Sequence, residues 1–505
     1  MQIEPAFEAF ATVHASAKPQ VVWTALVSDL ETPVSAYLKI AGQKSNAFLL
    51  ESVEGGAVKG RYSILGIEPD LIWRCRGSVA EINRRPAVDR TAFVPLPDAP
   101  LVELRKLLAE SKIDVPDRLP PMAAGVFGYL GYDMVRQMEH LPDVNPDPLG
   151  LPDALFIRPT VVLVFDAVKD QITVVTPVRP QPGQSAQAAY DRAVDRLTAV
   201  VDALDTPLDK QTPLPDHGEI MDGLVSNTSV EDYSAMVDRA KEYIAAGDIF
   251  QVVLSQRFST PFQLPPFSLY RALRRVNPSP FLYYLAFDGF SVAGSSPEIL
   301  VRVRDGKVTI RPIAGTRPRG ATPADDQRLG ADLLADQKER AEHLMLLDLG
   351  RNDVGRVAKI GSVNVTDKFF LEFYSHVMHI VSNVEGDLDP RHDLIDAMAA
   401  GFPAGTVSGA PKVRAMQIID ELEKEKRGLY AGCVGYFSAT GAMDTCIVLR
   451  TAVVKDGVMY VQAGAGIVAD SVNAMEQAEC VNKAKALLTA ADEAVKTAAR
   501  AGRGQ

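Results

Sequence analysis

Runs of β-forming residues that follow one another in blocks, without a helix between each pair, constrain the fold of this chain most strongly. The runs cover residues 47–53, 61–67, 71–77, 159–166, 171–178, 249–258, 280–287, 290–300, 307–315, 428–439, 445–454 and 458–468. A regular alternation of strands and helices predicts a parallel sheet, whereas blocks of strands predict antiparallel pairing. No period of 20–50 residues repeats, which excludes solenoids and propellers. We therefore expect an α+β fold built on large antiparallel sheets.

A polar stretch rich in proline divides the chain near residue 220. Residues 205–219 read DTPLDKQTPLPDHGE, which is typical of a boundary between two regions. We assign residues 1–220 to an N-terminal region and residues 221–505 to a second region. Thr228 and Glu231 have the spacing of a capping box and predict the start of a helix. The expected helices cover residues 100–111, 188–204, 233–244, 325–348, 413–423 and 473–490.

The composition shows no preference for a strongly charged partner. Of the 505 residues 47% are hydrophobic, and 53 Lys and Arg against 64 Asp and Glu give a net charge of −11. No block of one sign stands out, which argues against binding to nucleic acid or to a membrane surface. Cys75, Cys433, Cys446 and Cys480 form no CxxC pair, so we expect buried thiols in a reducing compartment. Because the N-terminus lacks a signal-peptide pattern, the expected location is the cytoplasm.

Two of the expected helices each carry a pair of glutamates three residues apart. Glu339 and Glu342 lie in line with apolar positions of their helix, and so do Glu476 and Glu479. Neighbouring carboxylates repel each other unless a cation lies between them. A hard divalent ion such as Mg²⁺ fits such a site. A solvent-exposed charged face, with Lys483 as an ordinary ion-pair partner of Glu479, explains the same pattern equally well.

Two further motifs have a structural and a functional interpretation. Gly464 and Gly466 follow an expected strand but lack the third glycine of the dinucleotide-binding fingerprint. They mark either a turn at the end of the strand or a place where backbone N–H groups meet an anionic ligand. His379 lies on an expected strand, where a core position and a catalytic role are both open.

A series of segments, in order along the chain, carries a family resemblance. They are LLES (49–52), GRYSILG (60–66), GYLGYD (128–133), GDIFQVVLSQRF (247–258), NPSPFLYYL (277–285), GSSPEILVRV (294–303), RPIAGTRPRG (311–320), DQKERAEHLMLLDLGRND (336–353), SHVMHIVSNVEG (375–386), GTVSGAPKVRAMQIIDELE (405–423), RGLYAGCVGYF (427–437), DTCIVLRTA (444–452), QAGAGIVADS (462–471) and ECVNKAKAL (479–487). Together they resemble the chorismate-utilising enzymes, most closely the anthranilate synthase component I branch. The resemblance implies antiparallel sheets packed face to face with helices outside, and a second region that binds chorismate and carries catalysis.

The resemblance implies an Mg²⁺-dependent enzyme. Glu342 and Glu479 match the family's direct metal ligands, and Glu339 and Glu476 match acids that act beside them, directly or through water. The metal is expected to hold the ring carboxylate of chorismate and to favour attack at the neighbouring carbon. The residues that match substrate contacts are Gly315, Thr316, Tyr430, Arg450, Gly464, Ala465, Gly466 and Lys483.

Two positions match the family's catalytic residues. Glu298 matches the general acid that protonates the departing ring hydroxyl, and His379 matches a histidine that positions the ring substituent and supports the later elimination. Ammonia is the implied nucleophile. Loss of pyruvate then gives anthranilate, the first step of tryptophan biosynthesis.

Gln251 and Ala314 separate the branches of the family. Relatives that attack with water carry a lysine base in place of Gln251, and lysine-type aminodeoxychorismate synthases carry a nucleophilic lysine in place of Ala314. Anthranilate synthase is therefore the implied activity. The alternative is aminodeoxychorismate synthase component I of the folate pathway, because some of those enzymes lack the lysine. A regulatory protein that binds tryptophan without catalysis is a third hypothesis, which the intact acids and histidine oppose.

The resemblance also implies feedback inhibition and a partner chain. LLES and NPSPF match a tryptophan pocket whose first part lies in the N-terminal region, although a tight turn before a strand explains the second segment as well. The residues expected to line the pocket are Glu51, Ser52, Pro278, Ser279 and Pro280. The sequence contains no GxCxGxQ motif of a glutamine amidotransferase. Ammonia is therefore expected from a separate amidotransferase subunit, with two copies of each chain.

Overall fold

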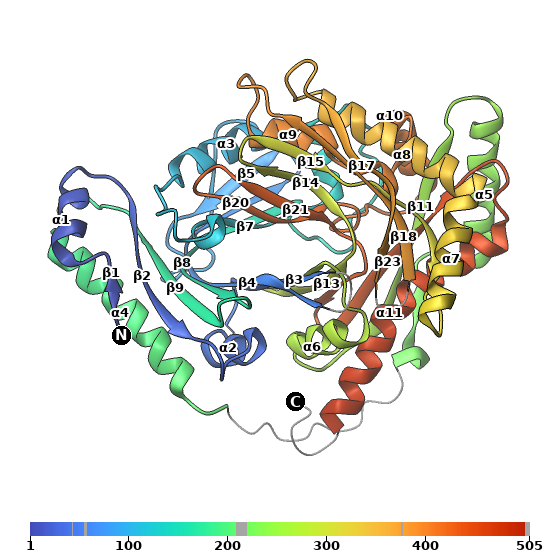
Figure 1. The fold of residues 1–505 in the computed structure, drawn as a ribbon. Coiled ribbons are helices and arrows are strands. Elements are labelled where there is room, and N and C mark those ends of the chain that lie inside the picture. Colours follow the sequence, from blue (N-terminus) through green and yellow to red (C-terminus); the bar gives the residue numbers. More distant parts are fainter. Residues whose placement is uncertain (43, 55–57, 209–219, 375–376, 500–505) are drawn as a thin grey trace.

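Antiparallel strands surrounded by helices make up the chain in the computed structural model (Figure 1). The structure describes residues 1–42, 44–54, 58–208, 220–374 and 377–499. The helices are α1 (Phe7–Ala15), α2 (Pro33–Ile40), α3 (Pro100–Glu110), α4 (Ala186–Asp205), α5 (Val230–Ala245), α6 (Pro266–Val276), α7 (Pro323–Ala335), α8 (Gln337–Gly355), α9 (Leu394–Gly401), α10 (Lys412–Leu422) and α11 (Asn473–Ala499).

The strands are short in most cases and two are long. They are β1 (Ile3–Glu4), β2 (Gln20–Val27), β3 (Ala47–Glu54), β4 (Val58–Arg76), β5 (Val79–Asn83), β6 (Val94–Pro95), β7 (Gly125–Leu130), β8 (Ala154–Asp166), β9 (Gln171–Val178), β10 (Val225–Ser226), β11 (Gln251–Pro261), β12 (Phe281–Phe287), β13 (Phe290–Ser296), β14 (Ile299–Arg304), β15 (Lys307–Ile310), β16 (Ile313–Pro318), β17 (Asn364–Phe373), β18 (Val377–Asp387), β19 (Gly409–Ala410), β20 (Cys433–Ser438), β21 (Met443–Ile447), β22 (Thr451–Lys455) and β23 (Val458–Ile467).

The two long strands, β4 and β8, belong to both layers of the β-structure. One layer runs β2–β9–β8–β4–β3–β12–β13–β22–β23–β11, and the other runs β4–β8–β7–β20–β21–β14–β15–β18. The register of β4 against β8 shifts between Pro69 and Leu71, where the pair passes from one layer to the other. All of these pairings are antiparallel, so the expected α+β class is confirmed.

Successive side chains of a strand point to opposite faces of the sheet. The strands therefore fill separate hydrophobic cores on their two faces. On β12, Tyr283 and Leu285 pack with Tyr436 of β20 in a core between the layers. Leu282 and Tyr284 point the other way, into a core under α6 and α11. The chain thus buries both faces of its central strands.

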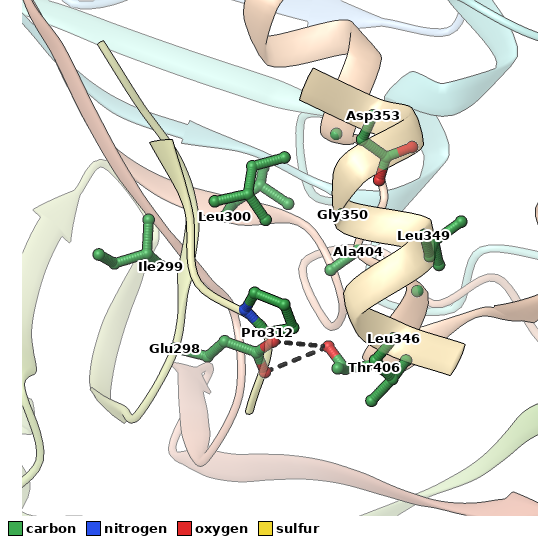
Figure 2. Close-up of a pocket in the computed structure, with 13 residues that line it drawn as sticks. Glu298, Ile299, Leu300, Pro312, Leu346, Leu349, Gly350, Asp353, Ala404 and Thr406 are labelled. Atoms are coloured by element: carbon green, nitrogen blue, oxygen red, sulfur yellow. Dashed lines mark hydrogen bonds between the residues drawn. The ribbon is translucent and has the colours of Figure 1, made fainter. Parts of the chain in front are cut away.

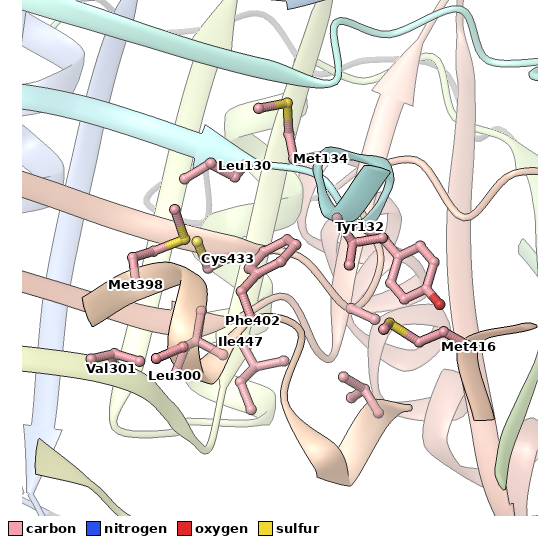
Figure 3. Packing of buried hydrophobic residues seen from close by; sticks show 14 of the residues in the cluster. Leu130, Tyr132, Met134, Leu300, Val301, Met398, Phe402, Met416, Cys433 and Ile447 are labelled. Carbon is pink, nitrogen blue, oxygen red and sulfur yellow. The ribbon is translucent and has the colours of Figure 1, made fainter. Parts of the chain in front are cut away.

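A third core lies between the second layer and helices α8, α9 and α10. Figure 3 shows Leu130 and Met134, which come early in the chain, packed in this core with Phe402, Cys433 and Ile447. In addition, β3 pairs with β12 and β7 with β20. Strands and cores therefore join residues from both sides of the boundary expected near residue 220, and residues 209–219 of that stretch lie outside the described part of the chain.

Several helices and strands begin or end at other residues than the sequence analysis predicts. The helix expected over 325–348 is two helices, because Asp336 ends α7 and its carboxylate caps α8 by accepting hydrogen bonds from the backbone N–H groups of Lys338 and Glu339. The cap of α5 is Ser229, one residue after the predicted Thr228. The strands expected over 290–300, 307–315 and 445–454 are each interrupted, whereas 61–67 and 71–77 are one strand, β4.

One expectation from composition has a structural counterpart. All four cysteines are free and buried, which matches the predicted thiols. Among the described residues, no helix combines the length and the apolar composition needed to cross a membrane.

Candidate active site

Polar side chains enter one region of the molecule where strands are interrupted. Glu298 follows β13 and precedes β14, and Arg450 lies between β21 and β22 with a φ of 49°. Gly315 interrupts the register of β16 against β18 and has a φ of 72°, a left-handed conformation that favours glycine. Each interruption turns a side chain or a backbone group out of the regular sheet.

The Glu298 carboxyl is buried, with 6% of the residue exposed. Burial raises its pKa to about 8, although a hydrogen bond from Thr406 and the charge of Arg450 favour the ionised form. The Thr406 hydroxyl donates to the two carboxyl oxygens, at 3.2 and 3.1 Å. A carboxyl that keeps its proton near neutral pH is suited to general-acid catalysis.

His379 lies on β18, and its two ring nitrogens have different environments. Nδ1 lies 3.0 Å from the backbone oxygen of Gly315 and 3.1 Å from Oγ1 of Thr316. Burial lowers the pKa of His379 to about 4, so the ring is neutral at pH 7. With the Nδ1 proton donated to Gly315, Nε2 is a proton acceptor, and it has no partner among the described residues.

Arg450 supplies a positive charge near Glu298. Burial lowers the pKa of this guanidinium, and the nearby groups of Tyr374 and Glu298 oppose that effect only in part. A buried cation in this state gains free energy from an added anion. Arg450 is therefore suited to bind a substrate carboxylate through two parallel hydrogen bonds, in bidentate fashion.

The glycines of β23 are required by their neighbours. A Cβ atom on Gly464 would lie 2.8 Å from the Leu254 backbone oxygen and 3.0 Å from the Tyr430 hydroxyl, and one on Gly466 would lie 2.4 Å from Nε2 of Gln251. Lys483 donates to the backbone oxygen of Gly464 at 2.8 Å. The structure thus brings Tyr430, Lys483 and the Gly464–Gly466 strand together.

Helices α8 and α11 bring the predicted carboxylates near each other. Burial raises the pKa of Glu342, and the negative charges of Glu339 and Glu479 raise it further. Burial likewise raises the pKa of Glu476, with a contribution from Glu479. Glu342 of α8 thus experiences the charge of Glu479 on α11, which an exposed face on a single helix would not produce.

Cationic and amide groups also contact these carboxylates. Lys483 pairs with Glu479 at 2.7 Å, Arg317 pairs with Glu339 at 3.2 Å, and the Gln251 amide favours the ionised form of Glu342. Among the described residues, no group of three or more His, Cys, Asp or Glu side chains has an arrangement that could hold a metal ion. Mg²⁺ keeps several waters and takes substrate oxygens as ligands, so one or two carboxylates suffice. The mutual repulsion of the glutamates fits a site of that kind.

The segments expected to form the tryptophan pocket are neighbours. Ser52 of β3 lies opposite Phe281 of β12, and Pro280 accepts a hydrogen bond from the backbone N–H of Val53. The carboxylate of Glu51 accepts hydrogen bonds from the side chains of Tyr270 and Arg274 on α6. The structure therefore joins the two segments and ties Glu51 to the helix beside them.

A buried ion pair that the sequence analysis did not assign supports the site. Arg427 bonds to Glu423 through two nitrogens, at 2.9 and 2.6 Å, and donates to the backbone oxygens of Val407 and Val253. Its guanidinium also lies over the ring of Tyr430, 5.5 Å from the centroid. Arg427 thereby ties the segment after Thr406 to β11 and to Tyr430. The four-residue spacing of Glu423 and Arg427 was visible in the sequence but gave no sign of burial.

Comparisons with known proteins identify the family of this chain. The family model described as chorismate binding enzyme matches residues 70–489. Anthranilate synthase component 1 of Cereibacter sphaeroides is 58% identical over 99% of both chains, and that of Aquifex aeolicus is 48% identical over 93% of this chain and 94% of the relative.

Solved structures give the same result. Anthranilate synthase component I from Streptococcus pneumoniae superposes with a TM-score of 0.74 at 37% identity, over 92% of this chain and 98% of that one. The menaquinone-specific isochorismate synthase from Escherichia coli, at 19% identity and a TM-score of 0.69 over 96% and 99% of the chains, shares the fold. The family model covers most of the chain, and relatives at 58% and 48% identity cover more than nine-tenths of it, so the chain belongs to the chorismate binding enzymes, among the anthranilate synthase component 1 proteins.

Proposed function

We propose that this chain is the catalytic component of an anthranilate synthase, which converts chorismate and ammonia into anthranilate, pyruvate and water. The observation that carries the proposal is the buried Glu298 carboxyl, whose pKa is raised to about 8 and which lies near the cation of Arg450. An acid and a carboxylate-binding cation at one place are what the loss of a ring hydroxyl from a dicarboxylate needs.

The first step forms a C–N bond and breaks a C–O bond. The nitrogen lone pair attacks the ring carbon next to the carboxylate-bearing carbon, the ring double bonds shift, and the hydroxyl leaves with the proton of Glu298 as water. The nitrogen then loses one proton. In the second step the aminated carbon loses its proton, the enolpyruvyl C–O bond breaks, and protonation of the released enol gives pyruvate. The neutral His379 ring, with its free Nε2, is a suitable proton acceptor near this bond.

The residues at two positions favour amination over related reactions. Gln251 is neutral and cannot deprotonate water, but its Oε1 is buried without a partner among the described residues and can accept an N–H of ammonia. Ala314 offers no nucleophile. The close relatives named above are anthranilate synthase components, which favours this activity over aminodeoxychorismate synthesis.

We further propose that the enzyme is Mg²⁺-dependent. Glu342 and Glu479 would hold the ion, with Glu339 and Glu476 beside them. When bound, Mg²⁺ supplies a positive charge that anchors the substrate carboxylate and draws electron density from the ring. The raised pKa of Glu342 supports this proposal: burial and then the charges of Glu339 and Glu479 disfavour its ionised form, and a cation between the helices would favour it.

Regulation and ammonia supply complete the proposal. The relatives' name, component 1, implies a second component, and we propose a glutamine amidotransferase as that partner, with two copies of each chain. Tryptophan is the proposed inhibitor, bound at Glu51, Ser52, Pro278, Ser279 and Pro280. The adjacency of β3 and β12 supports a common pocket for these residues.

The test mixes the purified chain with chorismate, ammonium and Mg²⁺ and records anthranilate fluorescence. We expect anthranilate with ammonium, none with glutamine in the absence of the partner, and loss of the signal on addition of tryptophan or removal of Mg²⁺. A non-aromatic amino product that needs a separate lyase would instead establish the aminodeoxychorismate activity. A folded sample that forms neither product would refute the proposal.

A further inference from the structure

A small cavity lies behind the Glu298 carboxyl (Figure 2). Its volume is about 30 Å³, enough for one or two water molecules and too small for chorismate. Helix α8 forms one wall with Leu346, Leu349 and Gly350. Glu298 is at one end of the cavity in Figure 2 and Asp353 is at the other. Of the residues assigned above to metal, substrate and catalysis, Glu298 alone lines this space.

Asp353 has a buried carboxylate, and only one of its two oxygens has a hydrogen-bond partner among the described residues. The residue is 4% exposed, and Oδ2 accepts a hydrogen bond from Nζ of Lys412 at 3.0 Å. Oδ1 is buried and has no partner among the described residues. A buried oxygen without a hydrogen bond costs free energy, and water in a cavity with polar groups at both ends removes that cost. The side chain of Lys412 is 11% exposed, which connects Asp353 to the surface.

We propose that this cavity holds water that connects Glu298 to Asp353, and that Asp353 returns a proton to Glu298 between turnovers. The inference rests on the proposed function, in which Glu298 gives one proton to the departing hydroxyl in each cycle. Asp353, a carboxylate beside the Lys412 ammonium at rest, takes one proton from that ammonium and passes it through water to the Glu298 carboxylate. Lys412 then regains a proton from solvent. Charge and atoms balance over the cycle, because the amination releases one proton from nitrogen.

The charges around both carboxyls suit this transfer. Lys412 of α10 and Arg356 after α8 favour the ionised form of Asp353, whereas burial raises its pKa. Thr406 and Arg450 act in the same sense on Glu298, and burial again opposes them. Because each carboxyl is held between these opposing effects, neither keeps its proton irreversibly.

Two substitutions test the proposed proton route. One fills the cavity, and the other removes the proton that Asp353 passes on. Gly350→Ala adds a methyl group whose nearest neighbours would be Cγ2 of Ile310 and Cγ of Pro312, each at an ordinary contact distance of 3.5 Å. It fills the space without overlap, and alanine favours a helix more than glycine does. Asp353→Asn keeps the shape and removes the transferable proton. Asp420→Asn is the matched control, since Asp420 is 6% exposed and paired with Arg136 but does not line the cavity.

The assay follows anthranilate by rapid mixing of the full chain with chorismate, ammonium and Mg²⁺. Glu298 starts protonated, so we expect Gly350→Ala and Asp353→Asn to make the first anthranilate at the wild-type rate. Later turnovers wait for the proton, so a burst of about one product per chain precedes a steady rate at least tenfold lower. The ratio kcat/KM for chorismate stays unchanged, because the slow step follows the chemistry, so KM falls together with kcat. Wild type and Asp420→Asn show no burst, and the thermal midpoint of Gly350→Ala is not lowered.

The outcomes separate this inference from the proposed function. If the wild type forms no anthranilate, the proposed function fails. If the wild type is active and Glu298→Gln is not, while both cavity variants keep the wild-type steady rate without a burst, the proton route is wrong. A first turnover slowed as much as the steady rate also overturns the inference, because it indicates an effect on the chemistry or on the fold.

Discussion

Replacing Glu298 with glutamine should remove a pH-dependent loss of stability. The ordinary pKa of this carboxyl is 4.5 and burial raises it to about 8 in the folded protein. Between these values the folded chain binds more protons than the unfolded chain, so the free energy of unfolding falls as the pH rises. At 1.36 kcal/mol per unit, the loss is complete at about pH 8 and reaches about 5 kcal/mol. Below pH 4.5 the carboxyl contributes no such loss.

Glu298→Gln has no charge to bury, so its stability relative to the wild type should increase between pH 4.5 and 8.5 by up to about 5 kcal/mol. The measurement is urea unfolding of both proteins at several pH values in this range. Activity with ammonium should be lost at every pH, since the amide has no proton to give. A stability difference that does not change with pH would refute the reasoning, because it would mean that Arg450 holds the carboxylate ionised in the folded protein.

Three further substitutions test other parts of the site. Glu342→Gln should raise the Mg²⁺ concentration for half-maximal activity at least tenfold, while the unfolding midpoint stays the same or rises; an unchanged Mg²⁺ titration would exclude Glu342 as a ligand. Gly315→Ala should cost about 1–2 kcal/mol of stability, because φ is 72° and the new Cβ would lie 3.1 Å from Oε2 of Glu339, and thermal unfolding measures this. Arg427→Ala should cost about 3–5 kcal/mol in denaturant unfolding, since it leaves Glu423 buried and unpaired; a cost below about 1 kcal/mol would show that the pair is not needed.

The general architecture could be predicted because the pattern of apolar residues along the chain directly indicates where strands lie. Strands in blocks predicted antiparallel layers, and β3, β9, β12 and β23 begin and end within about a residue of the expected runs. The pattern could not show that β4 is one strand, because a run of apolar residues looks the same on either side of a bend. Pairing partners such as β3 and β12 were likewise not predictable from composition, since they are more than 200 residues apart in the chain.

The site was predictable only as far as its motifs extend. Long family motifs identified Glu298 and His379, and the structure places both among buried polar contacts. Asp353 and Lys412 lie in quoted motifs too, yet their pairing joins positions 59 residues apart. Spacing along the chain carries no information about such a contact, which arises only when α8 and α10 pack against the same core.

The errors in the strand assignment coincide with positions of the candidate site. A regular strand sends successive side chains to opposite faces, and here both faces are buried in apolar cores. A glutamate or arginine in a continuous strand would therefore lie in a hydrophobic core without a partner. The interruptions at Glu298 and Arg450 instead place the two side chains where their charges act on each other. A proline followed by a charged residue inside an otherwise apolar run, as at Pro297 and Glu298, is thus evidence for a site as well as for a broken strand.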